Sequence, residues 1–304
     1  MDKSQLISLI KVPFGYGAGR MGSELGPERL LRWGLIEQWK ELGYVLDEPS
    51  RILLKDQWSD KSDKAVSVPL KNASKVLSIC TALASEVKLK RDEGHFPFIL
   101  GGDHSIAMGS LAGLTADGGS LGVIWMDAHS DLNTEETTPS RNMHGIPLAV
   151  GLGRAALKLS HICEGAADID PSKTVLIAAR ELDPGEKELI KELGIHCYTM
   201  HEIDKLGIQK VIDEAVDITS SGTDGVHLSF DIDSIDPTEA PGTGTPVQGG
   251  LSYREGHFAM ELLYEAGIIT SCDFVEVNPR LDRNNRTSKL AVDLIGSLFG
   301  KRIL

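Results

Sequence analysis

Short apolar segments alternate with longer amphipathic ones along most of this 304-residue chain. Seven segments have the length and aliphatic composition of buried strands: 6–10, 96–100, 121–126, 174–178, 197–199, 226–230 and 271–275. Helical patterns fall between most of them, at 26–42, 70–93, 185–193, 203–218 and 252–266, and a last helix is expected at 288–299. This alternation predicts an α/β protein with a mostly parallel sheet that is covered by helices on both faces.

The chain also has signals for helix ends and for its number of domains. Gly94, Gly194 and Gly267 follow three of the helical patterns, and the spacing of Ser252 and Glu255 is that of a capping box. The polar stretch 47–63 interrupts the pattern and is interpreted as a surface excursion. Because nothing resembles a linker and α/β proteins of this length often form one domain, we expect a single domain over residues 1–304.

Acidic and imidazole side chains follow several of the expected strands. The segments 127–131 (Asp-Ala-His-Ser-Asp) and 231–233 (Asp-Ile-Asp) alternate with a period of two, and in extended backbone such residues point the same way. Because the carboxyl ends of parallel strands meet at one edge of a sheet, these side chains should converge there. The six candidates are His104, Asp127, His129, Asp131, Asp231 and Asp233.

Four carboxylates and two imidazoles in one place predict a dinuclear metal site. Without cations the carboxylates would raise one another's pKa, and two divalent ions would balance their charge. Oxygen and nitrogen ligands without thiolate favour Mn, with Zn, Co, Ni or Fe possible. Two such ions, roughly 3.5–4 Å apart, can lower the pKa of a shared water and direct the resulting hydroxide at an electrophile. A loop with capping roles would explain one such motif alone, but not three motifs after three strands.

The composition excludes some other classes of protein. With 31 Lys and Arg against 44 Asp and Glu, the net charge is −13, and no clustered basic surface for nucleic acid is expected. The only basic run, 88–91, is interpreted as a helix end. The four cysteines are far apart and are expected to be reduced thiols. No segment has the length of a membrane span or of a signal peptide, so we expect a cytoplasmic protein without a membrane partner.

Four motifs resemble the signatures of the ureohydrolases, the family of arginases and agmatinases. They are 100–105 (Leu-Gly-Gly-Asp-His-Ser), 127–131, 229–237 (Ser-Phe-Asp-Ile-Asp-Ser-Ile-Asp-Pro) and 276–279 (Glu-Val-Asn-Pro). The resemblance runs from about residue 12 to residue 300. The loop 131–145 is similar to that of arginases, and the whole sequence is most similar to the bacterial, bacillus-type arginases. The fold that this implies is a three-layer α/β/α domain.

The resemblance implies two Mn²⁺ ions per subunit and hydrolysis of L-arginine to L-ornithine and urea by a metal-bridging hydroxide. It gives one ion to His104, Asp127, Asp131 and Asp231, and the other to Asp127, His129, Asp231 and Asp233. Asp127 and Asp231 would then bridge the two ions.

Three residues are expected to act in catalysis. Asp131 could hold the hydroxide by a hydrogen bond, and Glu276 fits the carboxylate that receives the guanidinium. His144 is the expected proton shuttle to the leaving amine, with a purely structural loop histidine as the alternative.

The resemblance also assigns residues to the amino-acid end of the substrate. Asn133, Ser140 and Asn142 would bond the α-carboxylate directly or through water, and Asp183 would pair with the α-ammonium. Asp183 could equally be a helix cap before 184–186. Thr245 corresponds to a position near the guanidinium, and a role in the turn 242–246 is the alternative.

Two positions depart from the family pattern, since Arg141 and Ser234 stand where glycine is usual. If that glycine uses a positive φ, Arg141 is strained or the loop shifts, which bears on the contacts of Ser140 and Asn142. The Arg141 guanidinium could instead reach a carboxylate, or simply be solvated. Ser234 is small and should disturb little.

Competing functions remain open at this stage. Another guanidino compound could be the substrate, as in an agmatinase, a guanidinobutyrase or a formiminoglutamase, or the chain could be a catalytically silent homologue. The family resemblance implies a homo-oligomer, a trimer or hexamer. Arg254 and Glu255 resemble positions of inter-subunit ion pairs, and a solvated helix face is an equally good interpretation.

Overall fold

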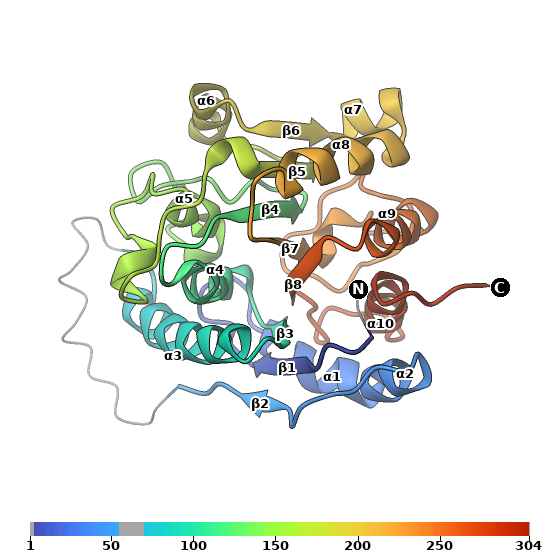
Figure 1. The fold of residues 1–304 in the computed structure, drawn as a ribbon. Coiled ribbons are helices and arrows are strands. Elements are labelled where there is room, and N and C mark those ends of the chain that lie inside the picture. Colours follow the sequence, from blue (N-terminus) through green and yellow to red (C-terminus); the bar gives the residue numbers. More distant parts are fainter. Residues whose placement is uncertain (1–2, 55–69, 304) are drawn as a thin grey trace.

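Eight parallel strands form the sheet at the centre of the molecule (Figure 1). The computed structural model describes residues 3–54 and 70–303. Within them the strand order is β2-β1-β3-β8-β7-β4-β5-β6. The strands are β1 Ile7–Val12, β2 Ser50–Arg51, β3 Phe96–Gly101, β4 Leu121–Met126, β5 Thr174–Ala179, β6 His196–Thr199, β7 Gly225–Asp231 and β8 Ile269–Val275.

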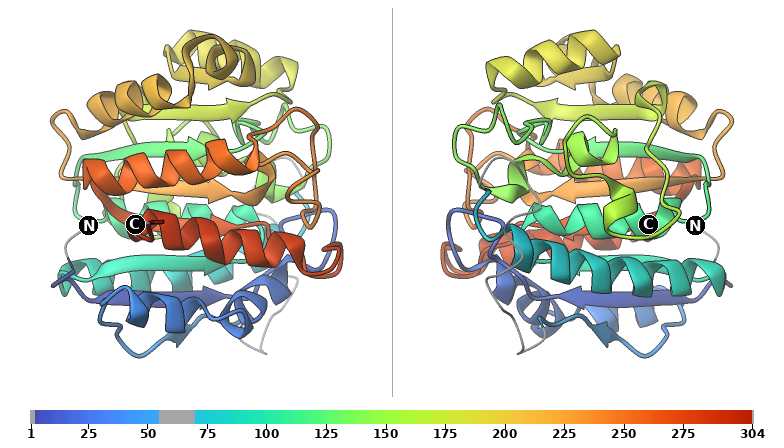
Figure 2. Two further views of the ribbon diagram at one scale, coloured as in Figure 1. Left: turned by 90° about the vertical axis from the view of Figure 1, so that its right-hand side faces the viewer. Right: turned by 90° about the vertical axis from the view of Figure 1, so that its left-hand side faces the viewer.

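Two layers of helices cover the two faces of this sheet (Figure 2). One layer consists of α1 Gly26–Arg32, α2 Leu35–Glu41, α7 Met200–Leu206, α8 Ile208–Ser220, α9 Tyr253–Ala266 and α10 Arg286–Leu298. The other consists of α3 Ala73–Asp92, α4 Ala107–Thr115, α5 Pro147–Gly151 and α6 Pro184–Leu193. The predicted fold class, a parallel sheet with helices on both faces, is confirmed.

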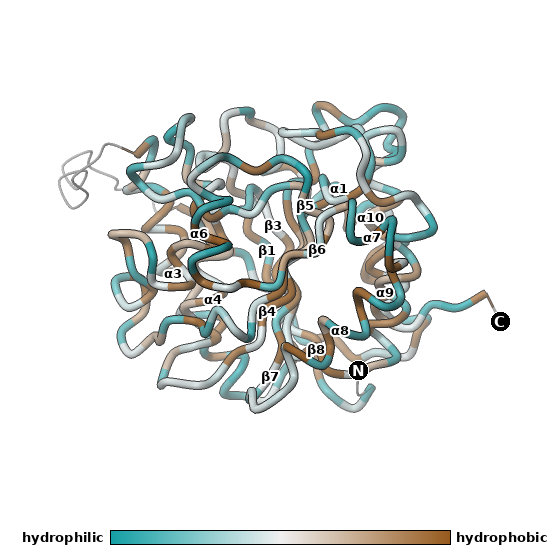
Figure 3. Tube along the Cα trace, turned by 90° about the horizontal axis from the view of Figure 1, so that it is seen from above, coloured by the Kyte–Doolittle hydropathy of each residue, from teal (hydrophilic) through white to brown (hydrophobic). Residues whose placement is uncertain are grey.

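The strands are apolar because both of their faces are buried. Every residue of β3, β4 and β5 is buried, as expected for parallel strands between two helix layers. Colouring by hydropathy shows the hydrophobic strands in the middle and hydrophilic segments around them (Figure 3). The short apolar segments in the sequence were therefore a reliable sign of the sheet.

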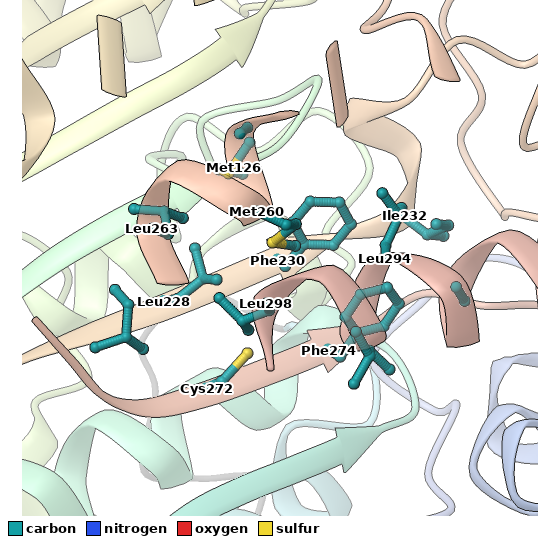
Figure 4. Close-up of a cluster of buried hydrophobic side chains, with 14 of the residues drawn as sticks. Met126, Leu228, Phe230, Ile232, Met260, Leu263, Cys272, Phe274, Leu294 and Leu298 are labelled. Carbon is teal, nitrogen blue, oxygen red and sulfur yellow. The ribbon is translucent and has the colours of Figure 1, made fainter. Parts of the chain in front are cut away.

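A cluster of buried side chains fixes α9 and α10 against the strands that carry much of the chemistry (Figure 4). The rings of Phe230 in β7 and Phe274 in β8 stack with centroids 4.8 Å apart and planes 20° apart. Helix side chains that belong to the same buried cluster include Met260, Leu263, Leu294 and Leu298. Phe230 directly precedes Asp231, the last residue of β7, and Phe274 lies two residues before Glu276, which follows β8, so this packing helps to hold both acidic groups in place.

Two of the predicted helices are each divided by a glycine. The prediction of one helix over 26–42 is wrong, because α1 and α2 are separated at Gly34, whose φ is 87°. The prediction of one helix over 203–218 is also wrong, because Gly207, with φ 80°, separates α7 from α8. Both φ values lie in a region that glycine adopts readily and other residues rarely do. The other four predicted helices are observed, and their ends differ from the predicted ends by at most three residues.

The predicted helix start at Ser252 and the predicted helix end at 88–91 are both observed. Ser252 caps α9 in the predicted capping box with Glu255, and the basic run 88–91 lies at the end of α3. Part of the polar stretch 47–63 forms the edge strand β2, and its residues 55–63 lie outside the described residues. Neither α4 nor α5 was predicted from the sequence. Within residues 3–54 and 70–303, no helix combines the length and the apolar character needed to cross a bilayer.

Candidate active site

The candidate residues lie at the carboxyl ends of the four central strands. His104 follows β3, Glu276 follows β8, Asp231 ends β7 and Asp127 follows β4, and these strands are neighbours in the order β3-β8-β7-β4. After β3 and β4 the chain continues into α4 and α5 in one helix layer. After β7 and β8 it continues into α9 and α10 in the other layer. Where the chain leaves neighbouring strands toward opposite faces of the sheet, a crevice forms at the strand ends. Parallel sheets bind their ligands in such crevices.

The two period-two motifs converge through tight turns. Asp127 Oδ1 accepts a hydrogen bond from His129 N (2.7 Å), and Asp231 Oδ1 accepts one from Asp233 N (2.7 Å). Residues Ile232–Ser234 form a short 3-10 helix, and Asp131 has a φ of 53°. The prediction of extended backbone through these motifs is therefore wrong, although the side chains do come together as predicted. Asp carboxylates commonly bond the backbone two residues on, which turns the chain at both places.

The first cluster surrounds one nitrogen of His104. His104 Nδ1 lies 3.0 Å from Asp127 Oδ2, 3.1 Å from Asp131 Oδ2 and 3.3 Å from Asp231 Oδ2. Among the described residues, neither His104 Nδ1 nor Asp131 Oδ2 makes a hydrogen bond. Burial alone would lower the pKa of His104. The three nearby carboxylates outweigh burial and raise this pKa well above its usual value. The cluster therefore attracts positive charge to Nδ1.

The other nitrogen of His104 is fixed by a serine. His104 Nε2 lies 2.8 Å from Ser229 Oγ in β7, and the imidazole stacks on the Trp125 ring with centroids 4.2 Å apart. If Nε2–H donates to the serine, Nδ1 carries a lone pair that faces three carboxylates. Acceptors that face acceptors in a buried site require a cation between them. The donor set of this cluster thus fits a metal ion.

The second cluster shares Asp127 with the first. His129 Nδ1 lies 3.3 Å from Asp127 Oδ1 and 3.2 Å from Asp233 Oδ2. One ligand atom from each of Asp127, His129 and Asp233 can be chosen so that all lie within 4.8 Å of one another, and the same holds for His104, Asp127 and Asp231. Two groups that could each hold a cation therefore meet at Asp127. Asp231 belongs to the first of these groups, whereas the family resemblance gives it to both ions.

The carboxylates of the two clusters are strongly perturbed. Burial, and then the charges of Asp233 and Asp127, raise the pKa of Asp231 well above its usual range. Burial and the charge of Asp127 raise the pKa of Asp131 to about 7. Asp233 is raised as well, by burial and by Asp127. So many buried carboxylates are stable as anions only where cations compensate them, which is the situation that the sequence predicted.

A cavity of about 220 Å³ adjoins the clusters. Of the residues predicted to bind substrate, those that line this cavity are Asn133, Ser140, Asn142, Asp183 and Thr245. His104, His129, Asp131 and Asp231 line it as well, so the cavity joins the metal-ligand clusters to the predicted amino-acid end. A wider recess of about 680 Å³ shares His129, Asn142, His144 and Thr245 with it.

Asp183 combines the two roles that the sequence left open. It is the N-cap of α6, where its backbone N donates to Glu186 Oε2 (2.8 Å). Its carboxylate Oδ2 accepts a hydrogen bond from Asn133 Nδ2 (2.8 Å) and lies at the cavity wall. Capping is therefore observed, and it leaves the carboxylate in a position to meet a cationic group. Thr245 Oγ1 donates to Asp233 Oδ2 (3.0 Å), which ties the turn 242–246 to the second cluster.

Glu276 lies behind His144 and is almost completely buried. Its Oε1 accepts a hydrogen bond from His104 N (2.9 Å) and lies 3.1 Å from His144 Nδ1. Glu276 is 1% exposed and is absent from the described lining of the 220 Å³ cavity. Burial would lower the pKa of His144, but the hydrogen bond and charge of Glu276 raise it to about 9. His144, which does line the cavity, therefore carries a proton at neutral pH.

Several residues at the site adopt a backbone conformation that is unusual for their type. Asp131, Arg141, Ala178 and Glu276 have φ values between 53° and 74°. This left-handed region costs a non-glycine residue roughly 1–2 kcal/mol, and such strain concentrates at functional sites. For Arg141 the strained alternative is the one observed, with φ 59°, while Ser140 and Asn142 still line the cavity.

Arg180, at the end of β5, is a residue that the sequence analysis missed. Its backbone N donates to Ala128 O (2.8 Å), and its Nη2 donates to Asp233 O (2.6 Å) and Val247 O (2.8 Å). It thus links the loops after β4 and β7 to the turn that carries Thr245. Its place directly after an apolar segment was a usable signal. Ser229 belongs to the motif 229–237, but the sequence does not show that its side chain faces His104.

Comparisons with known proteins agree with this geometry. The sequence matches the Arginase family over residues 5–300. The chain belongs to the arginase family. The arginase of Bacillus subtilis (strain 168) is 50% identical over 304 residues, which cover 100% of both chains. The prediction of an arginase-type hydrolase, similar to the bacterial bacillus enzymes, is thereby confirmed.

Solved structures of arginases share the fold. The native arginase of Bacillus caldovelox, solved at pH 5.6, superposes with a TM-score of 0.91 at 46% identity, covering 99% of this chain and 100% of that one. The Entamoeba histolytica arginase in complex with L-ornithine superposes with a TM-score of 0.87 at 31% identity, covering 98% of this chain and 99% of that one. Membership of the arginase family implies a metal cofactor, and the two ligand clusters are the candidate sites for it.

Proposed function

We propose that the chain hydrolyses the guanidinium group of L-arginine to give L-ornithine and urea. One observation carries the proposal: two ligand clusters that share Asp127 lie beside a cavity that also presents amide, hydroxyl and carboxylate groups. A guanidinium that bears an amino-acid end has matching chemistry at both ends. The names of the homologues, and the L-ornithine in the Entamoeba complex, support the same substrate and product.

We further propose that the cofactor is a pair of Mn²⁺ ions. The ligands would be His104, Asp127, Asp131 and Asp231 for one ion and Asp127, His129, Asp231 and Asp233 for the other. Oxygen and nitrogen donors without thiolate suit manganese. When bound, the two ions would lower the pKa of a water molecule and so supply a nucleophile at neutral pH.

The chain's own residues would perform the remaining steps. Besides serving as a ligand through Oδ2, which faces His104 Nδ1 at 3.1 Å, the carboxylate of Asp131 can accept a hydrogen bond from the attacking water. Collapse of the tetrahedral intermediate requires a proton on the leaving amine. The raised pKa of His144, due mainly to Glu276, provides a protonated donor at the cavity wall. Glu276, which is 1% exposed and does not line the 220 Å³ cavity, would act on the guanidinium through its negative charge.

The amino-acid end of L-arginine would lie against the loop 133–142. Asn133, Ser140 and Asn142 can donate to a carboxylate, and Asp183 can accept from an ammonium. Thr245, held on Asp233, would lie near the guanidinium. By family resemblance we also expect a homo-oligomer, a trimer or hexamer. In the single chain Arg254 bonds Glu261 (2.9 Å) on its own helix. A cytoplasmic location and a single domain over residues 1–304 remain predictions from the sequence.

The test is a urea assay on the purified protein with L-arginine and with agmatine, each with and without added manganese. The proposal predicts manganese-dependent urea release from L-arginine and little from agmatine, which lacks the carboxylate. Urea release from agmatine in preference to L-arginine would show that another guanidino compound is the substrate. No urea from either compound, with metal bound, would indicate a silent homologue.

A further inference from the structure

The amino-acid end of the cavity lacks a charge that its proposed substrate requires. Asn133, Ser140 and Asn142 can donate hydrogen bonds to a carboxylate, but they are neutral. No lysine or arginine is among the described residues that line the 220 Å³ cavity. Asp183, the carboxylate assigned to this end, has the same sign of charge as the carboxylate of the substrate. A carboxylate that loses water there would have hydrogen bonds without a countercharge, which is unfavourable in a partly buried site.

Lys71 lies just outside this lining and contacts the loop 140–142 at two points, of which Asn142 lines the cavity and Arg141 does not. Its Nζ donates to Asn142 Oδ1 (3.2 Å), and its backbone N donates to Arg141 O (2.9 Å). The second contact uses the carbonyl of the residue with the strained φ of 59°. Lys71 precedes α3, and its neighbour Asn72 is held by a hydrogen bond from Nδ2 to Tyr16 O (2.9 Å). The backbone at Lys71 and Asn72 is therefore held against its neighbours, and it places the exposed ammonium beside the substrate loop.

The contact of Lys71 also determines which way the Asn142 amide points. An ammonium group can only donate hydrogen bonds, so the oxygen of the amide must face Lys71. The NH₂ group is then turned away from Lys71. It lies close to Gly19, where an added Cβ would come within 2.9 Å of Nδ2. Asn142 lines both the 220 Å³ cavity and the wider recess to which Gly19 belongs, so a carboxylate oxygen can reach its amide from either space. In this arrangement the positive charge stands directly behind the amide.

We propose that Lys71 is a specificity-determining residue that selects substrates with an α-carboxylate by orienting Asn142 and supplying the missing positive charge. The inference rests on the proposed function, because it concerns the same cavity and the same substrate. Lys71 acts through Asn142 and is therefore a positioning residue. Its effect should depend on the charge of the carboxylate and should weaken as the ionic strength rises, because the ammonium is exposed to solvent.

The experiment compares Lys71→Met with two other charge-removing variants in the manganese-loaded enzyme. Lys75→Met is the matched control, because Lys75 lies in the first turn of α3, four residues after Lys71, with its Nζ 4.3 Å from the centre of the Tyr16 ring. Arg20→Met tests the competing cation, because Arg20 lines the outer recess. The measurements are kcat and KM for L-arginine, and calorimetric titration with L-ornithine and with L-ornithinamide, whose neutral amide replaces the carboxylate.

Lys71→Met should raise the KM for L-arginine about 5- to 10-fold and change kcat less than about twofold, as expected for one charge-assisted contact that is partly solvated. The affinity of Lys71→Met for L-ornithine should fall by a similar factor. Its affinity for L-ornithinamide should equal that of the wild type. Lys75→Met should change the affinity for neither ligand. Lys71→Arg should bind L-ornithine almost as tightly as the wild type does.

The inference would be overturned if Lys71→Met lost equal affinity for L-ornithine and L-ornithinamide. It would also be overturned if KM increased only in Arg20→Met. An unchanged KM in Lys71→Met would also overturn it. If the wild type releases no urea from L-arginine, the proposed function fails instead. The titrations with L-ornithine and its amide then still decide whether Lys71 recognises a carboxylate.

Discussion

Replacing Ser229 by alanine tests whether the orientation of His104 matters for metal binding. The Ser229 hydroxyl lies 2.8 Å from His104 Nε2, and both residues are buried, at 0% and 1% exposure. Alanine removes the hydroxyl and almost nothing else. The imidazole would keep its place against Trp125 but would lose the partner that fixes its tautomer.

The expected magnitude follows from the burial of this contact. A buried N–H group that loses its acceptor costs about 1–3 kcal/mol. At 1.4 kcal/mol for each factor of ten, a cost of that size in the metal-bound state corresponds to a metal affinity about 5- to 140-fold weaker. This range includes the loss of about 10- to 100-fold that is typical when a metal-binding histidine loses its outer hydrogen-bond partner. Manganese affinity can be measured by competition with a chelator of known strength.

The chain offers a closely matched control in Ser271→Ala. Ser271 Oγ lies 2.9 Å from His227 Nδ1, and both residues are 0% exposed on the neighbouring strands β8 and β7. This variant makes the same chemical change beside a buried histidine that lies outside both ligand clusters. We expect both variants to lose similar thermal stability and only Ser229→Ala to lose manganese affinity. Wild-type affinity in Ser229→Ala would refute the reasoning, and so would an equal loss in Ser271→Ala.

Three further predictions concern the ligands, the proton donor and the backbone. Asp127→Ala should lose both metal ions and reduce urea release to background, because Asp127 is the residue that the two clusters share; metal analysis showing one retained ion would contradict this. His144→Ala should slow the reaction by about 10²–10⁴-fold with unchanged metal content, so a loss of metal would argue against the proton-donor role. Gly102→Ala should destabilise the fold by about 1–3 kcal/mol, because the added Cβ would lie 2.2 Å from Phe14 O; an unchanged midpoint of thermal unfolding would show that the loop yields.

The sheet was predictable because the sequence carries its signal directly. Strands that are buried on both faces must be apolar throughout. Every residue of β3, β4 and β5 is buried, and these segments are the apolar ones in the sequence. Helix α4 was missed for the converse reason: all nine of its residues are buried, so it has no polar face and no amphipathic pattern. The divisions at Gly34 and Gly207 were missed because a glycine inside a periodic pattern does not by itself reveal its φ.

The metal-ligand candidates were predictable because parallel strands bring their carboxyl ends to one edge. That rule needs only the positions of the strands, and it grouped His104, Asp127 and Asp231 correctly in space. Arg180 and Ser229 could not be assigned in the same way. Their contacts join residues that are 53 to 125 positions apart, and these contacts depend on the order of strands in the sheet. Strand order is set by packing and cannot be inferred from local pattern.

The most direct test of the central claim is a manganese titration of the metal-free protein, with urea release from L-arginine followed at each step. The shared Asp127 and the two ligand clusters predict that activity rises until two ions are bound per chain and then stays constant. Full activity with one ion per chain, or urea release that does not depend on bound metal, would contradict the account.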